Sequence, residues 1–222
     1  MLKGIFLIIC AATCWGMGGV AGQYLYQYHD ADMVWLCMVR QILAGCMFLL
    51  FAAFVQKQDI FAILKADTLN IIEFSFLGIL GAQLGYYYTI GLCNAATATV
   101  LQYMAPLYVM LWMSYKSRKI PDVRELIGIV GALVGVFLIA THGTLDSLAI
   151  SPMALTALSY AYYSIKPGQM LKKYTAATLI GWGQLISGVA LIIWRNPFTP
   201  AGQWDMSGYL AFAYLLLGAT IA

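Results

Sequence analysis

The sequence predicts an all-α polytopic membrane protein built from two inverted five-helix repeats, the second of them incomplete. Three observations lead to this fold class: a very apolar composition, a series of apolar stretches long enough to cross a bilayer, and an internal repeat of short motifs. Together they place almost the whole chain in the membrane, as helices joined by short loops.

The composition is that of a membrane protein. Of 222 residues, 62% are hydrophobic and 9% are charged, whereas soluble domains carry roughly 45–50% apolar and about 25% charged residues. Twelve Lys and Arg against nine Asp and Glu leave a net charge of only +3, so no basic face for nucleic acid is expected. The composition therefore excludes a soluble enzyme, a disordered chain and a nucleic-acid-binding protein.

A membrane-spanning helix needs about 20 apolar residues, and seven or eight such stretches follow one another along the chain. The predicted spans are residues 4–26, 32–55, 71–92, 95–114, 125–142, 148–165, 175–194 and 206–222. The first is too long for a signal peptide and is followed at once by further spans. Because the loops between the spans are short, we expect the functional site to lie within the bilayer.

Lys and Arg residues are distributed unevenly between the two ends of the predicted spans. Ten of the twelve lie at the N-terminus or in the loops after the second, fourth and sixth spans, whereas the opposite loops hold only Arg195. The remaining one, Arg40, lies inside the second span. Because short loops rich in Lys and Arg stay in the cytoplasm, the sequence predicts a cytoplasmic N-terminus.

An internal repeat relates early spans to late ones. Residues 22–25 (Gly-Gln-Tyr-Leu) reappear as residues 168–171 (Gly-Gln-Met-Leu). Residues 41–45 (Gln-Ile-Leu-Ala-Gly) correspond in the same way to residues 184–188 (Gln-Leu-Ile-Ser-Gly). Since the repeating unit has five helices, its second copy must enter the membrane from the opposite side, which is the usual plan of a secondary transporter.

Several short motifs follow one another along the chain, and their order and spacing are informative. They are Ala-Thr-Cys-Trp-Gly at 12–16, Arg40 before Ala44 and Gly45, Gly78, Gly81 and Gly85 with Tyr86 to Tyr88, Ala98 to Pro106, and the glycine-rich run at 128–136. In these motifs the chain resembles the drug/metabolite transporter superfamily, in its EamA-type branch of ten helices. The resemblance implies a first EamA-type repeat at residues 1–143 and a partial second repeat at 148–222.

The resemblance also implies a function. It indicates an integral membrane transporter of small metabolites, amino acids or related drug-like compounds, that works by export or exchange with alternating access. The last predicted span stops at Ala222, so about seven and a half of the family's ten helices are expected here. The alternative is a non-transporting membrane component or a truncated pseudo-transporter. The loop at 116–119 lacks the family's acidic residue, so no role is carried over to it.

Counting about 1.5 Å per helical residue brings polar, aromatic and helix-breaking residues of five spans to one depth. Near the midplane lie Trp15, Gln83, Pro106, Tyr160 and Gln184, with Tyr103 one turn outward and Arg40 and Tyr87 closer to the outer side. We interpret this set as a substrate cavity between the repeats. The alternative for each residue is a hydrogen bond or contact that only joins helices.

Two members of the set admit a more specific interpretation. Arg40 either extends outward to Asp30, Asp32 or lipid headgroups, or offers its planar guanidinium to a substrate carboxylate. Pro106 removes one helical hydrogen bond and is expected to kink the fourth span, as a hinge or cavity wall.

The remaining chemistry of the sequence is sparse. Five cysteines lie inside apolar runs without metal-ligand spacing, so we expect neither disulfides, a metal nor a cofactor. The sequence offers neither a nucleophile next to a base nor a pair of carboxylates, so we do not expect an enzyme. No Asp or Glu lies near the middle of a span and no phosphate-binding loop is present, which favours facilitated diffusion or exchange. The expected partners are a small-molecule substrate and the lipid bilayer of a bacterial inner (plasma) membrane; the oligomeric state stays open.

Overall fold

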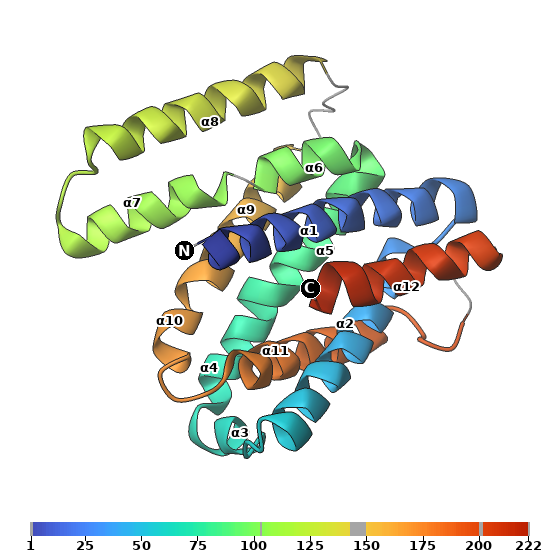
Figure 1. Cartoon of the computed structure of the whole chain (residues 1–222). Coiled ribbons are helices and arrows are strands. Elements are labelled where there is room, and N and C mark those ends of the chain that lie inside the picture. The colour runs from blue at the N-terminus through green and yellow to red at the C-terminus, as the bar shows by residue number, and fades with distance from the viewer. Residues whose placement is uncertain (1, 103, 143–149, 200–201, 222) are drawn as a thin grey trace.

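The computed structural model describes residues 2–102, 104–142, 150–199 and 202–221, and every regular element in this part of the chain is a helix (Figure 1). The N-terminal helices are α1 (Leu2–His29), α2 (Met33–Leu50), the π-helical η1 (Phe51–Val55), α3 (Ala62–Ala66), α4 (Thr68–Glu73), the π-helical η2 (Phe74–Leu80), α5 (Gly81–Leu92), α6 (Ala95–Gln102), α7 (Ala105–Ser117) and α8 (Val123–His142). The C-terminal helices are α9 (Ile150–Ile165), α10 (Pro167–Met170), α11 (Ala176–Ala190), the 3₁₀ segment η4 (Leu191–Ile193) and α12 (Met206–Ile221).

Four helical stretches are long and apolar enough to cross a membrane. They are Gly4–His29, Met33–Val55, Thr68–Leu92 and Ala176–Ile193. These stretches coincide with the first, second, third and seventh predicted spans. Helices also occupy the described parts of the other predicted spans, as α6 with α7, α8, α9 and α12. The all-helical membrane class predicted from composition is therefore confirmed.

The fourth span differs from its prediction as one kinked helix. It consists of two helices, because α6 ends at Gln102 and α7 begins at Ala105, with Met104 in a turn between them. Pro106 occupies the first turn of α7, where its missing N–H and fixed φ are accommodated. Inside a continuous helix its ring would collide with the carbonyl four residues earlier, so the chain breaks instead of bending.

The second and seventh spans begin in the same way. Asp32 caps α2 by accepting a 2.8 Å hydrogen bond from the Trp35 backbone N–H. Thr175 caps α11 by accepting a 3.3 Å bond from the Thr178 backbone N–H. Each cap satisfies a backbone donor that a helix start leaves without a partner. The two helices therefore start at defined residues at opposite ends of the bundle.

Helices from the two ends of the chain pack against one another in three pairs: α1 lies beside α12, α5 beside α9, and α2 crosses α11 (Figure 1). At the α2–α11 crossing small residues bring the backbones close. A Cβ on Gly45 would lie 2.7 Å from the backbone nitrogen of Leu185, and one on Gly188 would lie 2.9 Å from that of Ile42. Side chains at these two positions would therefore push the helices apart.

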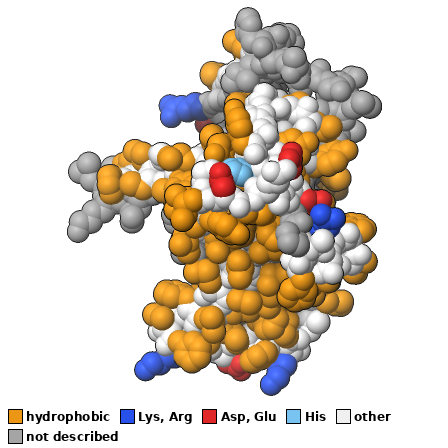
Figure 2. Space-filling view, turned by 90° about the vertical axis from the view of Figure 1, so that its right-hand side faces the viewer, with side chains coloured by type: hydrophobic (Ala, Val, Ile, Leu, Met, Phe, Trp, Pro, Cys, Tyr) orange, Lys and Arg blue, Asp and Glu red, His pale blue; other side chains and the backbone are white. Residues whose placement is uncertain are grey.

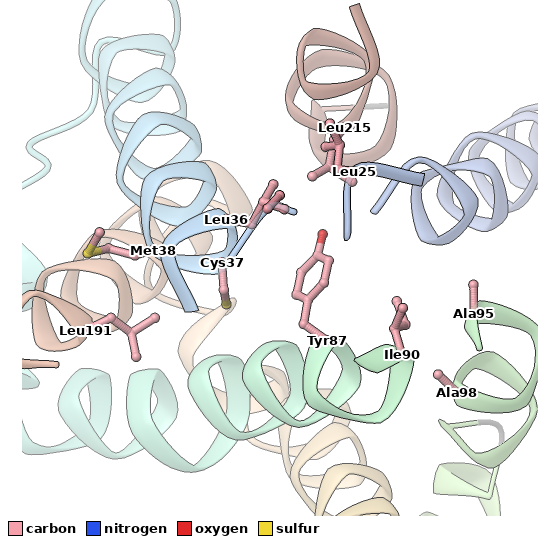
Figure 3. Close-up of a cluster of buried hydrophobic side chains, with 11 residues drawn as sticks. Leu25, Leu36, Cys37, Met38, Tyr87, Ile90, Ala95, Ala98, Leu191 and Leu215 are labelled. Atoms are coloured by element: carbon pink, nitrogen blue, oxygen red, sulfur yellow. The ribbon is translucent and has the colours of Figure 1, made fainter. Parts of the chain in front are cut away.

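Two clusters of buried apolar side chains hold the bundle together. One contains Leu25, Leu36, Cys37, Met38, Tyr87, Ile90, Leu191 and Leu215, drawn from α1, α2, α5, η4 and α12 (Figure 3). The other joins Ile63, Ile71, Phe74, Ile79, Met170 and Leu179 near α3 and α10. Outside, a broad hydrophobic surface covers the middle of this face, with Lys, Arg and acidic side chains at its lower edge and further charged groups and a His in the upper part (Figure 2). This apolar surface matches a protein embedded in a bilayer.

Candidate functional site

A small cavity lies where helices from both ends of the chain meet. Residues of α1, α2, α5, α6, α9 and α12 contribute to its wall. Its polar and aromatic lining consists of Trp15, Arg40, Gln83, Tyr86, Tyr87, Thr99, Gln102 and Tyr160. Five of these eight residues were predicted from helical depth alone, so the structure brings most of the predicted cavity set together.

Arg40 is the charged group of the cavity. Its side chain is buried, with 3% of the residue exposed, and it turns inward. The guanidinium Nη2 donates a hydrogen bond to Oε1 of Gln83, and its central carbon lies 5.3 Å from the centre of the Tyr87 ring. Such a cation gains from the negative face of the ring. Arg40 does not reach Asp32, whose Oδ2 lies 3.6 Å from Nε of Arg195, and its contact with a substrate carboxylate stays a prediction.

A row of aromatic rings forms one wall of the cavity. Trp15 and Tyr160 have ring centres 5.6 Å apart, and Tyr160 lies 5.7 Å from Tyr163 in a stacked arrangement. Tyr163 in turn stacks on Phe74 at 5.6 Å, which links the cavity to the apolar cluster near α3. Rings at these separations stabilise one another and offer flat faces to a ligand.

Three cavity residues that depth counting did not select come from α5 and α6: Tyr86, Thr99 and Gln102. Tyr86 and Thr99 line the cavity, and their hydroxyl oxygens are 3.0 Å apart. The signal that finds Tyr86 is its helical spacing, because residues three and four positions after Gln83 share its face. Gly19 of α1 leaves the room for this side chain, since a Cβ there would collide with the Tyr86 hydroxyl.

Three predicted site residues are not part of this assembly. Gln184 is buried on α11, and among the described residues its Oε1 has no hydrogen-bond donor. Pro106 lines a different, apolar groove of about 950 Å³ between α7, α8 and α9, which also includes Tyr160. Tyr103 lies outside the described residues. A shared depth therefore did not guarantee a shared cavity.

The cavity is small in this conformation. Its volume is about 40 Å³, room for no more than a few water molecules, whereas pockets for small-molecule ligands measure roughly 300–1,000 Å³. The structure therefore corresponds to a contracted site, and a ligand of metabolite size requires the surrounding helices to separate.

At the end of the bundle that carries the Lys-rich loops, the segment that includes α4 contacts the segment that follows α9. Lys166 lies 2.5 Å from Oε2 of Glu73, and Lys173 lies 3.1 Å from Oδ2 of Asp67. A hydrogen bond from Tyr174, followed by bonds from Lys173 and Asn70, holds the pKa of the Asp67 carboxyl below its usual range. Burial, and then its bond to Asp67, raises the pKa of Tyr174.

The opposite end is closed by backbone and ring contacts. The indole N–H of Trp35 donates to the Pro197 carbonyl at 3.0 Å, in the segment that follows α11. At the Lys-rich end the indole N–H of Trp182 donates to the Ile60 carbonyl at 2.7 Å, in the segment that follows α2. Each of the two crossing helices thus carries a Trp whose indole N–H donates to the backbone of the segment that follows the other helix.

The comparisons with known proteins agree with these features. The model of the EamA-like transporter family matches residues 2–141. The chain belongs to this family. This EamA-like chain is also 34% identical, over 229 residues, to the uncharacterised inner membrane transporter YicL of Salmonella typhimurium, an alignment covering 98% of this chain and 75% of that protein. No solved structure matches the chain.

Family membership and the apolar helices together identify a multi-pass membrane protein of the transporter class. Its cavity chemistry is that of binding. It combines a buried guanidinium, an amide and several aromatic faces, and in the described part of the chain no three His, Cys, Asp or Glu side chains converge as metal ligands. Such a site can orient a ligand by hydrogen bonds and ring contacts.

Proposed function

We propose that the protein carries small metabolites, amino acids or related compounds, across the bacterial inner membrane by alternating access. The observation that carries the proposal is the contact of buried Arg40 with Gln83 and Tyr87 in a cavity walled by helices from both predicted repeats, residues 1–143 and 148–222. In secondary transporters with inverted repeats the substrate binds between the repeats near the midplane.

The helix pairing supports the inverted repeat. Exchanging the two units turns α1 into α9, α2 into α11, and the third span, which contains α5, into α12. Under this exchange the α1–α12 pair becomes the α9–α5 pair, and both pairs pack closely. The same exchange maps α2 onto α11 and α11 onto α2, as expected for the two helices nearest a two-fold axis.

Individual contacts at the crossing support the same relation. The motif offset of 143 residues relates Ile42 to Leu185 and Gly45 to Gly188. Gly45 lies against the backbone of Leu185, and Gly188 lies against the backbone of Ile42. The two contacts are therefore exchanged by the proposed symmetry, with a glycine at the close approach in both.

The cavity chemistry favours a substrate that carries a carboxylate and an apolar or aromatic body. A guanidinium presents a planar fork of donors that matches a carboxylate with two parallel hydrogen bonds. The rings of Trp15 and Tyr160 offer a flat apolar surface beside it. Because the cavity is contracted, substrate binding requires the contacts at one end, such as Glu73 with Lys166, to separate while the other end stays closed.

The distribution of charge supports the orientation and the energetics of this carrier. The Lys-rich loops give a cytoplasmic N-terminus, and the relative's inner-membrane location fits a multi-pass bacterial protein. No acidic residue of the sequence lies near the middle of a predicted span. This favours exchange or facilitated diffusion over transport driven by an intramembrane carboxylate.

Substrate exchange in proteoliposomes tests the proposal. Purified protein is reconstituted into vesicles loaded with one unlabelled amino acid, and uptake of its radiolabelled form is followed across the set of amino acids. We expect uptake of at least one, and a loss of at least tenfold in Arg40→Lys, because Lys keeps the charge but not the fork. Gln83→Ala should raise the half-saturation concentration roughly 5- to 150-fold, because a lost hydrogen bond in a partly buried site costs about 1–3 kcal/mol.

A matched control is Gly131→Ala on α8, where an added Cβ meets nothing within 4 Å. It should transport like the parent. Arg40→Lys and Gln83→Ala variants as active as this control would remove these residues from the site. No exchange of any amino acid by well-folded protein would instead favour the alternative of a non-transporting membrane component.

A further inference from the structure

The end of the bundle away from the Lys-rich loops, called here the outer end, contains a buried histidine. His29 is the last residue of α1 and only 5% of it is exposed. Its Nδ1 lies 2.9 Å from the carbonyl oxygen of Gln203, and its Nε2 lies 3.3 Å from Oγ of Ser207 and 3.8 Å from Oδ1 of Asp205. One imidazole thus contacts the start of α12 and the loop before it.

The backbone also fixes this loop to the end of α1. The N–H of Gln203 donates to the carbonyl oxygen of His29 at 2.8 Å. The approach requires Gly202, which has a φ of +109° and where a Cβ would collide with that same carbonyl. Gly202 thus allows the loop to pack directly against His29. The imidazole therefore lies at a junction between the two predicted repeats.

The hydrogen bonds available at this junction depend on the protonation of His29. The Gln203 carbonyl can only accept, so Nδ1 carries a proton in either state. In neutral His29, Nε2 is then an acceptor, and the Ser207 hydroxyl must donate to it. Yet Ser207 Oγ also lies 2.7 Å from the Asp205 carboxylate, and a hydroxyl has a single hydrogen to donate. The neutral imidazole therefore leaves one of these two contacts without a hydrogen.

A second proton on His29 resolves the conflict. The Nε2–H then donates to Ser207 Oγ, which frees the Ser207 hydrogen for Asp205. The hydroxyl of Tyr24, 3.0 Å from Ser207 Oγ, can donate to the second lone pair of that oxygen. Every contact is satisfied at once, and the imidazolium lies near a carboxylate, so protonation stabilises the closed junction.

Several charged groups surround the junction. On α1 the Tyr24 ring packs edge-on at 5.1 Å from the imidazole, and Asp30 follows His29 directly. Asp32 of α2 pairs with Arg195 from the segment after η4, so acidic groups outnumber basic ones here. The Gly208 N–H, then the Ser207 hydroxyl and the charge of His29, lower the pKa of Asp205, which keeps that carboxylate ionised.

We propose that His29 is a proton-binding site whose occupancy couples pH at the outer end to closure of the junction between α1 and α12. Proton binding completes the hydrogen-bond chain from Gln203 through Ser207 to Asp205 and holds the outer end closed. Proton loss breaks this chain and lets the outer end open. Because a proton on His29 completes these contacts only in the closed junction, a fall in pH favours closure.

The test measures protonation and geometry separately. The chain has two histidines, so His142→Gln leaves a single imidazole whose ring signals, followed by NMR on isotope-labelled protein in lipid nanodiscs, report protonation of His29. Spin labels at Gln27→Cys on α1 and Leu210→Cys on α12, in a background without the native cysteines, report the distance between the helices by electron–electron double resonance. Both are measured between about pH 5.5 and 8, the range in which imidazoles change charge.

We expect one narrow distance distribution at the acidic end, a broader and longer one at the basic end, and a midpoint that coincides with the NMR titration. His29→Gln should abolish the pH response, whereas Asp30→Asn, which changes a neighbouring charge only, should keep it. Ser207→Ala keeps the imidazole but removes the relay, so it should retain the titration and lose the distance change. A distance distribution independent of pH, or a response that survives in His29→Gln, would overturn the proposal. Neither readout depends on substrate transport, so the result stands apart from the proposed function.

Discussion

The close approach of α2 and α11 makes a sharp prediction about Gly45. A Cβ at this position would lie 2.7 Å from the backbone nitrogen of Leu185 and 2.9 Å from the backbone oxygen of Gly181, whereas ordinary contacts begin at 3.4 Å. Both obstacles are backbone atoms, which cannot rotate away as a side chain would. The two helices must therefore move apart locally by about 0.7 Å in Gly45→Ala, with a loss of packing along the crossing.

The expected cost follows from comparison with a matched substitution. Overpacking of a close contact costs about 1–3 kcal/mol. A Gly to Ala change also raises helix propensity by about 1 kcal/mol, but Gly131→Ala on α8 gains the same propensity without any contact within 4 Å. The propensity effect cancels between the two variants. Gly45→Ala should therefore be less stable than Gly131→Ala by about 1–3 kcal/mol, a factor of roughly 5 to 150 in the unfolding equilibrium.

Reversible unfolding in mixed micelles, followed by circular dichroism as the fraction of SDS is raised, measures this difference. Gly188→Ala should behave like Gly45→Ala, because its Cβ would lie 2.9 Å from the backbone nitrogen of Ile42. Equal midpoints for Gly45→Ala and Gly131→Ala would refute the idea that backbone contact at the crossing limits side-chain size.

Three further predictions concern the ends of the bundle. In a background without the native cysteines, Ser117→Cys should resist a membrane-impermeant thiol reagent added to intact cells and Thr199→Cys should react, since the first lies in a Lys-rich loop region; labelling of position 117 from outside would reverse the orientation. The pKa of Asp67 is lowered in the folded protein. Its contribution to stability is therefore present above the ordinary pKa of an Asp, about 3.9, and disappears as the pH falls through the lowered value. In an unfolding titration, Tyr174→Phe should shift this loss of stability to a higher pH. Trp182→Phe removes the 2.7 Å indole bond to the loop after α2 and should lower stability by about 1 kcal/mol, while a variant as stable as the parent would show that water replaces this bond.

Depth within the membrane was predictable from the sequence because it follows from counting. Each helical residue advances about 1.5 Å, so the level of a side chain is known once the ends of a span are known. Trp15, Gln83 and Tyr160 were assigned to one level on this basis, and all three line the cavity. These residues could be selected from the sequence because a polar or large aromatic group in the middle of an apolar run needs a partner.

The direction in which a side chain points around its helix was not predictable in this way. Gln184 lies at a midplane position by the same count, yet it is buried on α11 away from the residues that line the cavity. Pro106 broke its span and lines the groove beside α8. Tyr86 was missed although it faces the cavity one turn from Gln83. Direction depends on which helix packs against which, and one sequence position does not specify its neighbour.

The sequence by itself determined the membrane class, the positions of the long apolar helices and the family, because each depends on local composition or on the order of motifs along one chain. The tertiary structure decided which side chains meet. It turned Arg40 inward to Gln83 and Tyr87 instead of outward to Asp32, and it brought His29 to Ser207 and Asp205 across 178 and 176 positions. Apolarity commits a segment to the bilayer wherever it lies, whereas a hydrogen bond between distant residues exists only after glycine contacts and helix crossings have set the distance between their backbones.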